Sequence, residues 1–196
     1  MRVIGLTGGV GAGKSLVLNL LKEEYGAEVI EADEVARELM DPGREGHQAV
    51  TRALGTGLLK EDGSIDRRLL AARIFQDENV RKTVNEIIHP MVWKAIDDKI
   101  SASQAGLIVV EFAIMGEKTD NSYDEMWYVH ASEQNRIRRL AESRGYTKER
   151  SKRIIASQAS EAEYLARCDR VIENNGSVKE VKEQLAEILK TGDKNS

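Results

Sequence analysis

A glycine-rich segment near the start of the chain constrains the fold more than any other feature. Residues 8–15 read GGVGAGKS, which fits the pattern of Gly, four residues, Gly, Lys and then Ser or Thr. Such glycines let successive backbone N–H groups curl round an anion, and a helix that follows adds the positive end of its dipole. The segment lies between an apolar run at 2–6 and a stretch with helical spacing from Lys14. This context predicts a phosphate-binding loop between a buried strand and a helix.

Other apolar runs predict a parallel α/β sheet around this loop. We expect five strands, at residues 2–6, 27–33, 106–112, 125–131 and 169–174. Runs this apolar suit strands buried on both faces, and the first two strands with the helix between them make a βαβ unit. Gly26 is expected to end that helix, and Ser177 with Glu180 predicts a capping box at the start of the last helix. The predicted fold is a P-loop NTPase-type five-stranded parallel sheet flanked by helices.

Two segments interrupt the sheet pattern. Residues 34–102 are charged and helical, with turn signals at 41–43, 55–57 and 62–64. Residues 136–153 carry eight Lys or Arg against two Glu, in a chain whose net charge is −4. Gly145 permits a hinge there and Thr147 can cap a second helix. We therefore expect a nucleotide-binding core at 1–33, 103–135 and 165–196, an inserted helical substrate lobe at 34–102 and a helical lid at 136–164.

Residue types at the predicted strand ends indicate how a nucleotide is used. Lys14 would reach the β and γ phosphates, and Ser15 would ligate Mg²⁺. Glu111 ends an apolar strand, where a carboxylate is costly unless it is paired or near a cation, so we expect it in the magnesium shell. Asp33 would either orient an acceptor hydroxyl or cap the helix expected from Glu34. The expected nucleotide-binding residues are Gly8, Gly9, Gly11, Ala12, Gly13, Lys14, Ser15 and Leu16.

Other nucleotide-binding patterns fit less well. A dinucleotide-binding loop would need a third glycine at the position of Lys14, and Lys14 would crowd the close helix–strand packing. A guanine-reading Asn-Lys-x-Asp motif is approached by EKTD at 117–120, but the Glu117 carboxylate cannot supply the amide donor. ATP is therefore the favoured nucleotide. The basic segment 136–153 would close over its triphosphate and exclude water, although most of these charges also suit a solvated helix face.

Composition limits the remaining possibilities. The chain has 196 residues, 41% hydrophobic and 32% charged, which is typical of a globular protein. Its one cysteine and three dispersed histidines predict neither a disulfide nor a zinc cluster. No stretch has the length of a signal sequence or a membrane span. We expect a cytoplasmic protein, a monomer or weak oligomer, with no nucleic-acid or membrane partner.

Beyond the loop, the chain resembles the dephospho-coenzyme A kinase family from residue 3 to about 190. The resemblance rests on six segments in this order: IGLTGGVGAGKS, VIEADEVAREL, GSIDRRLLAARIF, IIHPMV, RRLAESRGYTKERSKRIIASQ and CDRVIENNGS. It implies transfer of the γ-phosphoryl group of ATP to the ribose 3′-hydroxyl of dephospho-CoA, with Mg²⁺. It further implies that Asp33 orients or deprotonates this hydroxyl, that Lys14 and Ser15 serve the phosphates and the metal, and that Arg139 reaches the triphosphate.

The chain departs from the family pattern at several positions. Glu31 stands where the family usually has Asp, and Leu16 stands where Thr usually follows the loop serine. Near the third strand Glu111 and Glu117 match as acids, but Ala113 replaces a proline. Ser143 occupies the position of a lid arginine, and Arg144 lies one residue further on. Two alternatives stay open: another small-molecule P-loop kinase, such as a nucleoside monophosphate kinase, and a P-loop ATPase or switch module without an acceptor.

Overall fold

The computed structural model describes residues 1–112 and 123–192. The chain forms two compact units, one made of Met1–Ile30 with Gln104–Ser196 and the other of Glu31–Ser103. No helix within the described residues is both long and apolar enough to cross a membrane. The positions 113 and 117 to 120, which the sequence analysis considered, lie outside the described residues.

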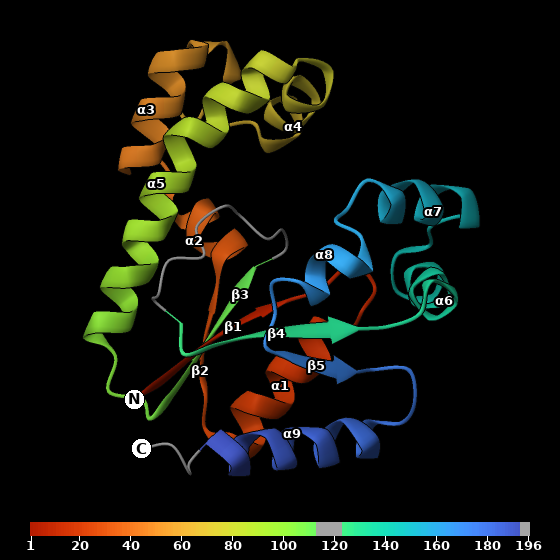
Figure 1. Ribbon diagram of the computed structural model, residues 1–196. Helices are drawn as coiled ribbons and strands as arrows, with labels where there is room; N and C mark the ends of the chain where they lie inside the picture. The colour runs from red at the N-terminus through yellow and green to blue at the C-terminus, as the bar shows by residue number, and fades with distance from the viewer. Residues whose placement is uncertain (113–122, 193–196) are drawn as a thin grey trace. The chain divides into compact units, whose positions relative to one another are not determined.

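The first unit is built on a parallel sheet (Figure 1). Its strands are β1 (Arg2–Thr7), β2 (Glu28–Glu31), β3 (Leu107–Phe112), β4 (Glu125–His130) and β5 (Arg170–Glu173). They lie in the order β2-β3-β1-β4-β5, so β1 is central and pairs in parallel with both β3 and β4. The five-stranded parallel sheet predicted from the apolar runs is confirmed.

Helices of this unit cover the sheet and carry the segments around the loop. They are α1 (Lys14–Tyr25), α6 (Glu133–Arg144), α7 (Lys148–Ala156), α8 (Glu161–Leu165) and α9 (Val178–Gly192). Figure 1 shows α1 and α9 side by side on one face of the sheet, where Lys182 of α9 forms an ion pair with Glu24 of α1. Because both helices turn apolar residues toward the strands, they close the core on this side.

The core of this unit consists of side chains that water does not reach. From the strands come Ile4, Leu6, Val109, Trp127, Val129 and Ile172, and from the two helices come Val17, Leu21, Val181 and Leu185. In β1 and β3 every residue after the first is buried, so both faces of these strands are covered. The sheet is therefore a rigid support for whatever its carboxyl edge carries.

The strand register decides which residues meet at that edge. Thr7, the last residue of β1, is aligned with Phe112 of β3 and with Tyr128 of β4. Leu6 is aligned with Glu111, so the Glu111 carboxylate belongs to the same edge as the loop that starts at Gly8. This is the edge at which parallel α/β sheets bind ligands.

The second unit is helical. Its elements are α2 (Ala32–Leu39), α3 (Glu45–Leu54), the 3₁₀ helix η1 (Thr56–Leu58), α4 (Arg67–Gln76) and α5 (Glu78–Ala102). The other three α-helices pack along α5 (Figure 1), which buries Val84, Ile88, Val92 and Ile96 at a spacing of one helical turn. Asp66 caps α4 and Asp77 caps α5, each by accepting two backbone N–H groups of the first turn.

Local predictions are confirmed at most element ends and wrong at one. Gly26 ends α1 in the left-handed conformation, Thr147 caps α7, and Ser177 with Glu180 forms the predicted capping box. The second strand, however, ends at Glu31 rather than Asp33. Ala32 begins α2 and Asp33 lies in its first turn, so Asp33 is not a helix cap. Alanine favours helix and acidic side chains stabilise a helix N-terminus, which explains the earlier start.

Candidate functional site

The glycine-rich loop connects β1 to α1 and leaves the start of α1 open. Gly13 is the N-cap of α1 with φ of 94°, and no side chain caps the helix there. That backbone conformation favours glycine over residues with a Cβ. At Gly8 a Cβ would lie 2.6 Å from the Val129 carbonyl oxygen of β4, so only glycine fits so close to the sheet.

Backbone N–H groups at the turn of the loop are available to a ligand. Within the described residues, the N–H groups of Gly11, Gly13, Lys14 and Ser15 donate to no protein acceptor. The Ala12 N–H, by contrast, donates to the Gly9 carbonyl at 3.0 Å and tightens the turn. Unpaired N–H groups at a helix N-terminus form an anion-binding site together with the helix dipole.

Lys14 is held at this site by two oxygens. Its Nζ donates to the Gly8 carbonyl at 2.8 Å and lies 3.4 Å from Oε1 of Glu111. The side chain of Glu111 is 8% exposed and that of Lys14 is 16% exposed. A carboxylate this buried is stabilised by a neighbouring cation.

The Val10 peptide of the loop is held on both sides by residues of 136–164, the segment in which the sequence analysis expects a lid. The Arg136 Nε of α6 donates to the Val10 carbonyl at 2.8 Å, while the Val10 N–H donates to Oε1 of Gln158 at 2.9 Å. Arg136 also donates to that same Gln158 oxygen at 2.6 Å, which closes a ring of three hydrogen bonds. Burial lowers the pKa of the Arg136 guanidinium, but arginine stays protonated at neutral pH.

The Ala12 peptide has a similar pair of supports. Its carbonyl accepts from Arg139 of α6 at 3.1 Å and from Nδ2 of Asn174 at 2.8 Å. Asn174 is 2% exposed, and its own carbonyl accepts from Arg139 at 2.7 Å. We call Arg136, Gln158, Arg139 and Asn174 the loop brace. The brace pairs the Val10 and Ala12 carbonyls with protein donors, while the N–H groups of Gly11, Gly13, Lys14 and Ser15 stay open within the described residues.

Aromatic and charged contacts fasten α8, which follows the basic segment, to the sheet. The rings of Tyr164 of α8 and Tyr128 of β4 stack at 4.6 Å, nearly parallel. Burial raises the pKa of Tyr128 to about 12, so its phenol stays neutral. At the end of β4, Nδ1 of His130 lies 2.8 Å from a Glu173 oxygen, and its Nε2 lies 3.7 Å from Glu161 of α8. The segment that carries Gln158 is thus anchored beyond α7.

The remaining residues considered in the sequence analysis differ in their exposure and in their contacts. Ser15 is exposed, whereas Leu16 packs against the hydrophobic core and so adds no hydroxyl to the site. Asp33 lies in the helical unit on α2, is exposed, and has no hydrogen bond or ion pair within the described residues. Arg144 ends α6 with its guanidinium 6.0 Å from the Tyr146 ring centre. Ser143 donates to the Arg139 carbonyl at 2.6 Å.

The candidate magnesium ligands are oxygen atoms, which suit this metal. Ser15 supplies a hydroxyl and Glu111 a carboxylate, both from the region of the loop. The described part of the chain contains no cluster of three or more His, Cys, Asp or Glu side chains able to hold a metal ion. Magnesium in phosphate-transfer sites is held by one or two protein ligands, with water and phosphate oxygens supplying the rest. The two residues fit that kind of site.

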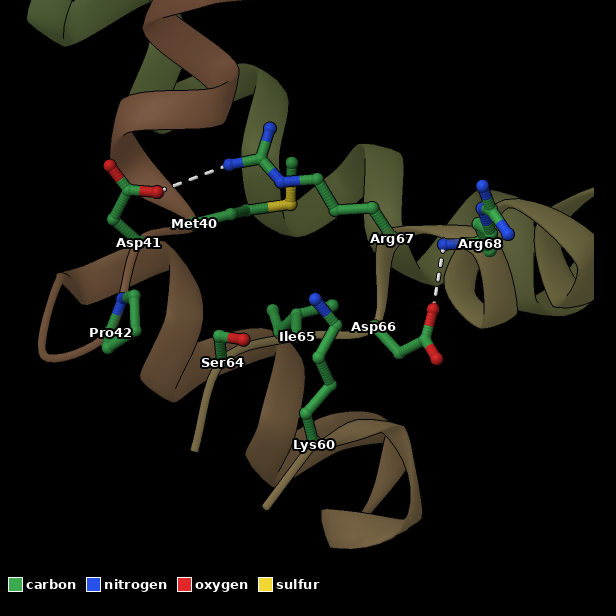
Figure 2. Close-up of a pocket in the computed structure, with 9 residues that line it drawn as sticks. All are labelled: Met40, Asp41, Pro42, Lys60, Ser64, Ile65, Asp66, Arg67 and Arg68. Carbon is green, nitrogen blue, oxygen red and sulfur yellow. Dashed lines mark hydrogen bonds and ion pairs between the residues drawn. The ribbon is translucent and has the colours of Figure 1, made fainter. Parts of the chain in front are cut away.

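The helical unit contains a cavity of its own, of about 560 Å³. Its lining residues are Met40, Asp41, Pro42, Lys60, Ser64, Ile65, Asp66, Arg67 and Arg68. Figure 2 shows Arg67 and Met40 along one side of this space and Lys60, Ser64 and Ile65 along the other. Arg67 reaches Asp41 at 3.1 Å across one end. This cavity combines cations with apolar side chains.

Sequence reasoning assigned no role to Gln158 or Asn174. Both stand in family-like segments, SQ at 157–158 and ENN at 173–175, so the signal that could have found them is their place in those segments. Amide side chains in connecting segments carry no periodic pattern that would reveal a long-range partner. Their contacts with the loop appear only when the chain is folded.

Comparison with known proteins gives a consistent result. A family model described as dephospho-CoA kinase matches residues 2–180. A curated relative from Geobacillus kaustophilus, named dephospho-CoA kinase, is 38% identical over 194 residues, covering 97% of this chain and 96% of the relative. The crystal structure of TT1252 from Thermus thermophilus has a TM-score of 0.80 at 27% identity, with 97% of each chain covered.

A second solved structure supports the fold alone. The dephospho-CoA kinase from Campylobacter jejuni has a TM-score of 0.70 at 20% identity, and 97% of this chain and 96% of that chain are covered. Both the sequence and the structural comparisons therefore cover 97% of the chain.

Proposed function

The chain belongs to the dephospho-CoA kinase family, and from this premise we propose that it transfers the γ-phosphoryl group of ATP to the ribose 3′-hydroxyl of dephospho-CoA. The observation that carries the proposal is the braced loop, in which the Val10 and Ala12 carbonyls accept from arginines while N–H groups at the start of α1 stay open within the described residues. Such a loop binds a phosphate chain. The family membership adds that the phosphorylated compound is dephospho-CoA and the enzyme a kinase.

On the donor side, Gly8, Gly9, Gly11, Ala12, Gly13, Lys14, Ser15 and Leu16 bind the triphosphate. Leu16 packs against the core and supplies no hydroxyl. The loop would therefore bind the phosphates mainly through backbone N–H groups and Lys14. Lys14 replaces its hydrogen bond to the Gly8 carbonyl with bonds to the β and γ phosphates. Positive charge there stabilises the transition state, in which negative charge spreads over the phosphoryl oxygens.

Magnesium is the proposed cofactor, with the Ser15 hydroxyl as a direct ligand and Glu111 in the surrounding shell. Bound at the phosphates, the ion would neutralise their charge and help to orient them. Glu111 also keeps Lys14 at the loop through the ion pair at 3.4 Å. The carboxylate thus supports the site both by placing the lysine and by completing the oxygen set that the metal prefers.

On the acceptor side, Asp33 orients or deprotonates the 3′-hydroxyl. An alcohol is a weak nucleophile, and a positioned carboxylate that accepts its proton lowers the barrier. Asp33 suits this role because it is exposed and unpaired within the described residues, and because it sits on α2 immediately after the end of β2. Neighbouring Glu34 is engaged instead with Arg37 at 2.8 Å.

Arg139 has two tasks in this proposal. It braces the Ala12 carbonyl through one terminal nitrogen and Asn174 through the other. Since a guanidinium carries five N–H donors, further donors can reach the triphosphate. Residues 136–164 would act as a lid, and exclusion of water by the lid would direct the phosphoryl group to the alcohol. This support for a lid consists of the basic charge and the contacts of α6 and Gln158 with the loop.

An acceptor assay tests the proposal. The protein is incubated with ATP, Mg²⁺ and either dephospho-CoA or a nucleoside monophosphate, and products are separated by chromatography. We expect CoA from dephospho-CoA and no phosphorylated product from the monophosphates. Phosphorylation of a monophosphate alone would support the kinase alternative, and ATP turnover unaffected by any acceptor would support an ATPase or switch module. The family comparisons do not favour either alternative.

Several expectations stay predictions from the sequence. These are a cytoplasmic location, a monomer or weak oligomer, and the absence of a nucleic-acid partner. The division into a core, a substrate lobe and a lid is likewise a proposal about function. The two compact units of the structure separate at residues 30–31 and 103–104.

A further inference from the structure

His130, at the end of β4, connects the sheet to the short helix α8 that follows the brace residue Gln158. We infer that His130 is a positioning residue of the phosphate loop: its protonated ring holds α8 through Glu161, and α8 holds Gln158 at the Val10 N–H. This inference rests on the nucleotide-binding part of the proposed function, and it adds a dependence of that binding on pH.

One ring nitrogen of His130 is committed to the sheet. His130 is aligned with Glu173 of β5 in the parallel register, and its Nδ1 lies 2.8 Å from Oε2 of Glu173. The Asn175 amide nitrogen donates to that same oxygen at 2.9 Å. Because a carboxylate only accepts hydrogen bonds, Nδ1 carries the proton of the neutral ring. The neutral ring therefore has its lone pair at Nε2.

The other ring nitrogen of His130 faces α8. Its Nε2 lies 3.7 Å from an oxygen of Glu161, the first residue of α8. In the neutral ring, a lone pair is opposite a carboxylate oxygen and no proton lies between them. The second proton makes Nε2 a donor and places a positive charge between two carboxylates. The attraction to α8 is therefore present at low pH and is lost as pH rises through the titration of the imidazole.

The connection from α8 to the loop is short. Gln158 lies three positions before Glu161, and Ser160 between them begins α8 with a capping box. This cap fixes the backbone at the start of α8, so the place of α8 determines the place of Gln158. The Gln158 oxygen accepts from the Val10 N–H at 2.9 Å and from Arg136 at 2.6 Å. Hydrogen bonds weaken steeply outside a narrow geometry, so a displaced α8 would loosen the brace.

The other ionisable groups described around this contact keep their charge near neutral pH. The ring of Tyr128 lies 5.7 Å from that of His130, and burial raises the pKa of Tyr128 to about 12. Burial also raises the pKa of Tyr164, which stacks on Tyr128. Arg136 acts on both phenols and stays protonated, and carboxyl groups titrate at about pH 4. Since the stacked phenols hold α8 at any of these pH values, the expected effect of His130 is moderate.

The first test measures the binding of ADP with Mg²⁺ by calorimetry at about pH 6 and about pH 8. ADP offers phosphates to the loop and has no γ-phosphoryl group to donate, so the measurement is independent of the proposed reaction. We expect the Kd for ADP in Glu161→Gln to exceed that of wild type roughly threefold at the lower pH and to equal it at the higher pH. Protonation of the ADP phosphate is common to both proteins and cancels in the ratio. The same ratio at both pH values would overturn the inference.

Glu183→Gln is the matched control for this variant. Glu183 of α9 is exposed to nearly the same extent as Glu161, and it lies 3.7 Å from the Lys179 ammonium, the distance that also separates Glu161 from His130. Lysine titrates far above both pH values, at about 10.4. The Kd of Glu183→Gln should equal that of wild type at both pH values. A ratio that changes with pH in this variant as well would assign the effect to net charge and contradict the inference.

Two further variants follow the path from His130 to the loop. His130→Asn keeps an amide nitrogen near the position of Nδ1 and has no group at the position of Nε2, so it should weaken ADP binding at the lower pH as Glu161→Gln does. When Gln158→Leu is already present, adding Glu161→Gln should change the Kd at neither pH, because the connecting residue is missing. An undiminished threefold effect in that background would show that the contact does not act through Gln158, and the inference would be wrong.

The outcomes separate this inference from the proposed function. ADP binding with the expected ratios, but without any CoA formation in the acceptor assay, would keep His130 as a positioning residue and reject the proposed reaction. CoA formation together with a ratio that does not change with pH would do the reverse. No binding of ADP to the wild-type protein would reject both.

Discussion

The phosphate loop presents backbone groups, whereas the cavity of the helical unit is lined by side chains. The loop offers backbone N–H groups whose orientation is set by buried supports such as Asn174, at 2% exposure. The cavity offers side chains, and the Arg67–Asp41 pair at its rim is more than half exposed on both sides. A braced backbone has little freedom to lose when a ligand binds, whereas exposed charges rearrange and contribute little individually.

The two sites are therefore expected to respond differently to substitution. Binding of the nucleotide phosphates depends on geometry that any disturbance of the brace would spoil. The cavity instead offers several exposed charge and apolar contacts, each of which can be removed with a small effect. Substitutions at Asp33 and at the brace should therefore have larger effects than substitutions in the cavity.

The largest effect is expected at the reacting group itself. Asp33→Asn keeps the size of the side chain but cannot accept the proton of an alcohol as a carboxylate does. We expect kcat to fall on the order of 10²–10⁴-fold, with little change in the KM for ATP. The measurement is a set of steady-state rates over both substrate concentrations.

A neighbouring acid provides the control for this variant. Glu34→Gln removes an equally exposed carboxylate one residue further along α2, where it pairs with Arg37. We expect kcat within about twofold of wild type for this variant, since exposed pairs contribute little. If Asp33→Asn reduced ATP affinity and kcat equally, or if both variants lost activity alike, the role assigned to Asp33 would be wrong.

An intermediate effect is expected at the brace. Gln158→Leu removes the oxygen that accepts both from the Val10 N–H and from Arg136. Because two donors are left without that acceptor, we expect the KM for ATP to rise roughly tenfold. Gln158→Glu retains the acceptor and should recover part of the loss, which a purely structural role in packing would not predict.

The brace can also be tested against an unrelated amide. Gln48→Leu removes an exposed glutamine of α3 that donates to the Gly43 carbonyl. Its KM for ATP should equal that of wild type. Equal KM values for ATP in Gln158→Leu and wild type would show that the loop keeps its shape without the brace, and the contrast between loop and cavity would then be lost.

The smallest effect is expected at Glu125, where a substitution should change the stability of the sheet unit but not the shape of its loop. Glu125 begins β4, and burial alone would raise the pKa of its carboxyl. The Trp127 indole and the Arg2 and Arg170 guanidiniums outweigh burial and lower that pKa. A carboxyl with a lowered folded-state pKa stabilises the fold above its ordinary value of 4.5, and the contribution is lost as pH falls through the folded-state pKa.

Glu125→Gln should therefore destabilise the protein at neutral pH by on the order of 1 kcal/mol. The difference from wild type should vanish at pH values below the folded-state pKa, as measured by urea unfolding over a pH series. The KM for ATP should not change, because Glu125 lies at the opposite end of β4 from the loop. A difference that grows as pH falls would contradict the sign of this effect.

How far the sequence predicts the molecule depends on how local each signal is. Strand β1, the start of α1 after the loop and the cap at Ser177 are specified by neighbouring residues, and these predictions of local structure are confirmed. The predicted end of β2 was wrong because Ala32 and Asp33 suit both the end of a strand and the start of a helix. The packing of α2 against α5 favours the helix, and this packing is not evident locally.

The brace and the cavity could not be predicted from neighbouring residues, because each depends on contacts between distant parts of the chain. Gln158 and Asn174 meet the loop across 148 and 162 positions of the chain. No periodic pattern connects residues that distant, so the sequence indicated the loop but not its supports. The cavity likewise depends on how Lys60 and Arg67 come to opposite sides of one space, which follows from the packing of the helical unit.

We propose that the phosphoryl group passes from the braced loop to an alcohol and not to water. The most direct test measures ADP and CoA in the same reaction mixture, with and without dephospho-CoA. We expect equal amounts of ADP and CoA when the acceptor is present, and almost no ADP when it is absent. ADP formed at the same rate without the acceptor, or in large excess over CoA, would contradict it.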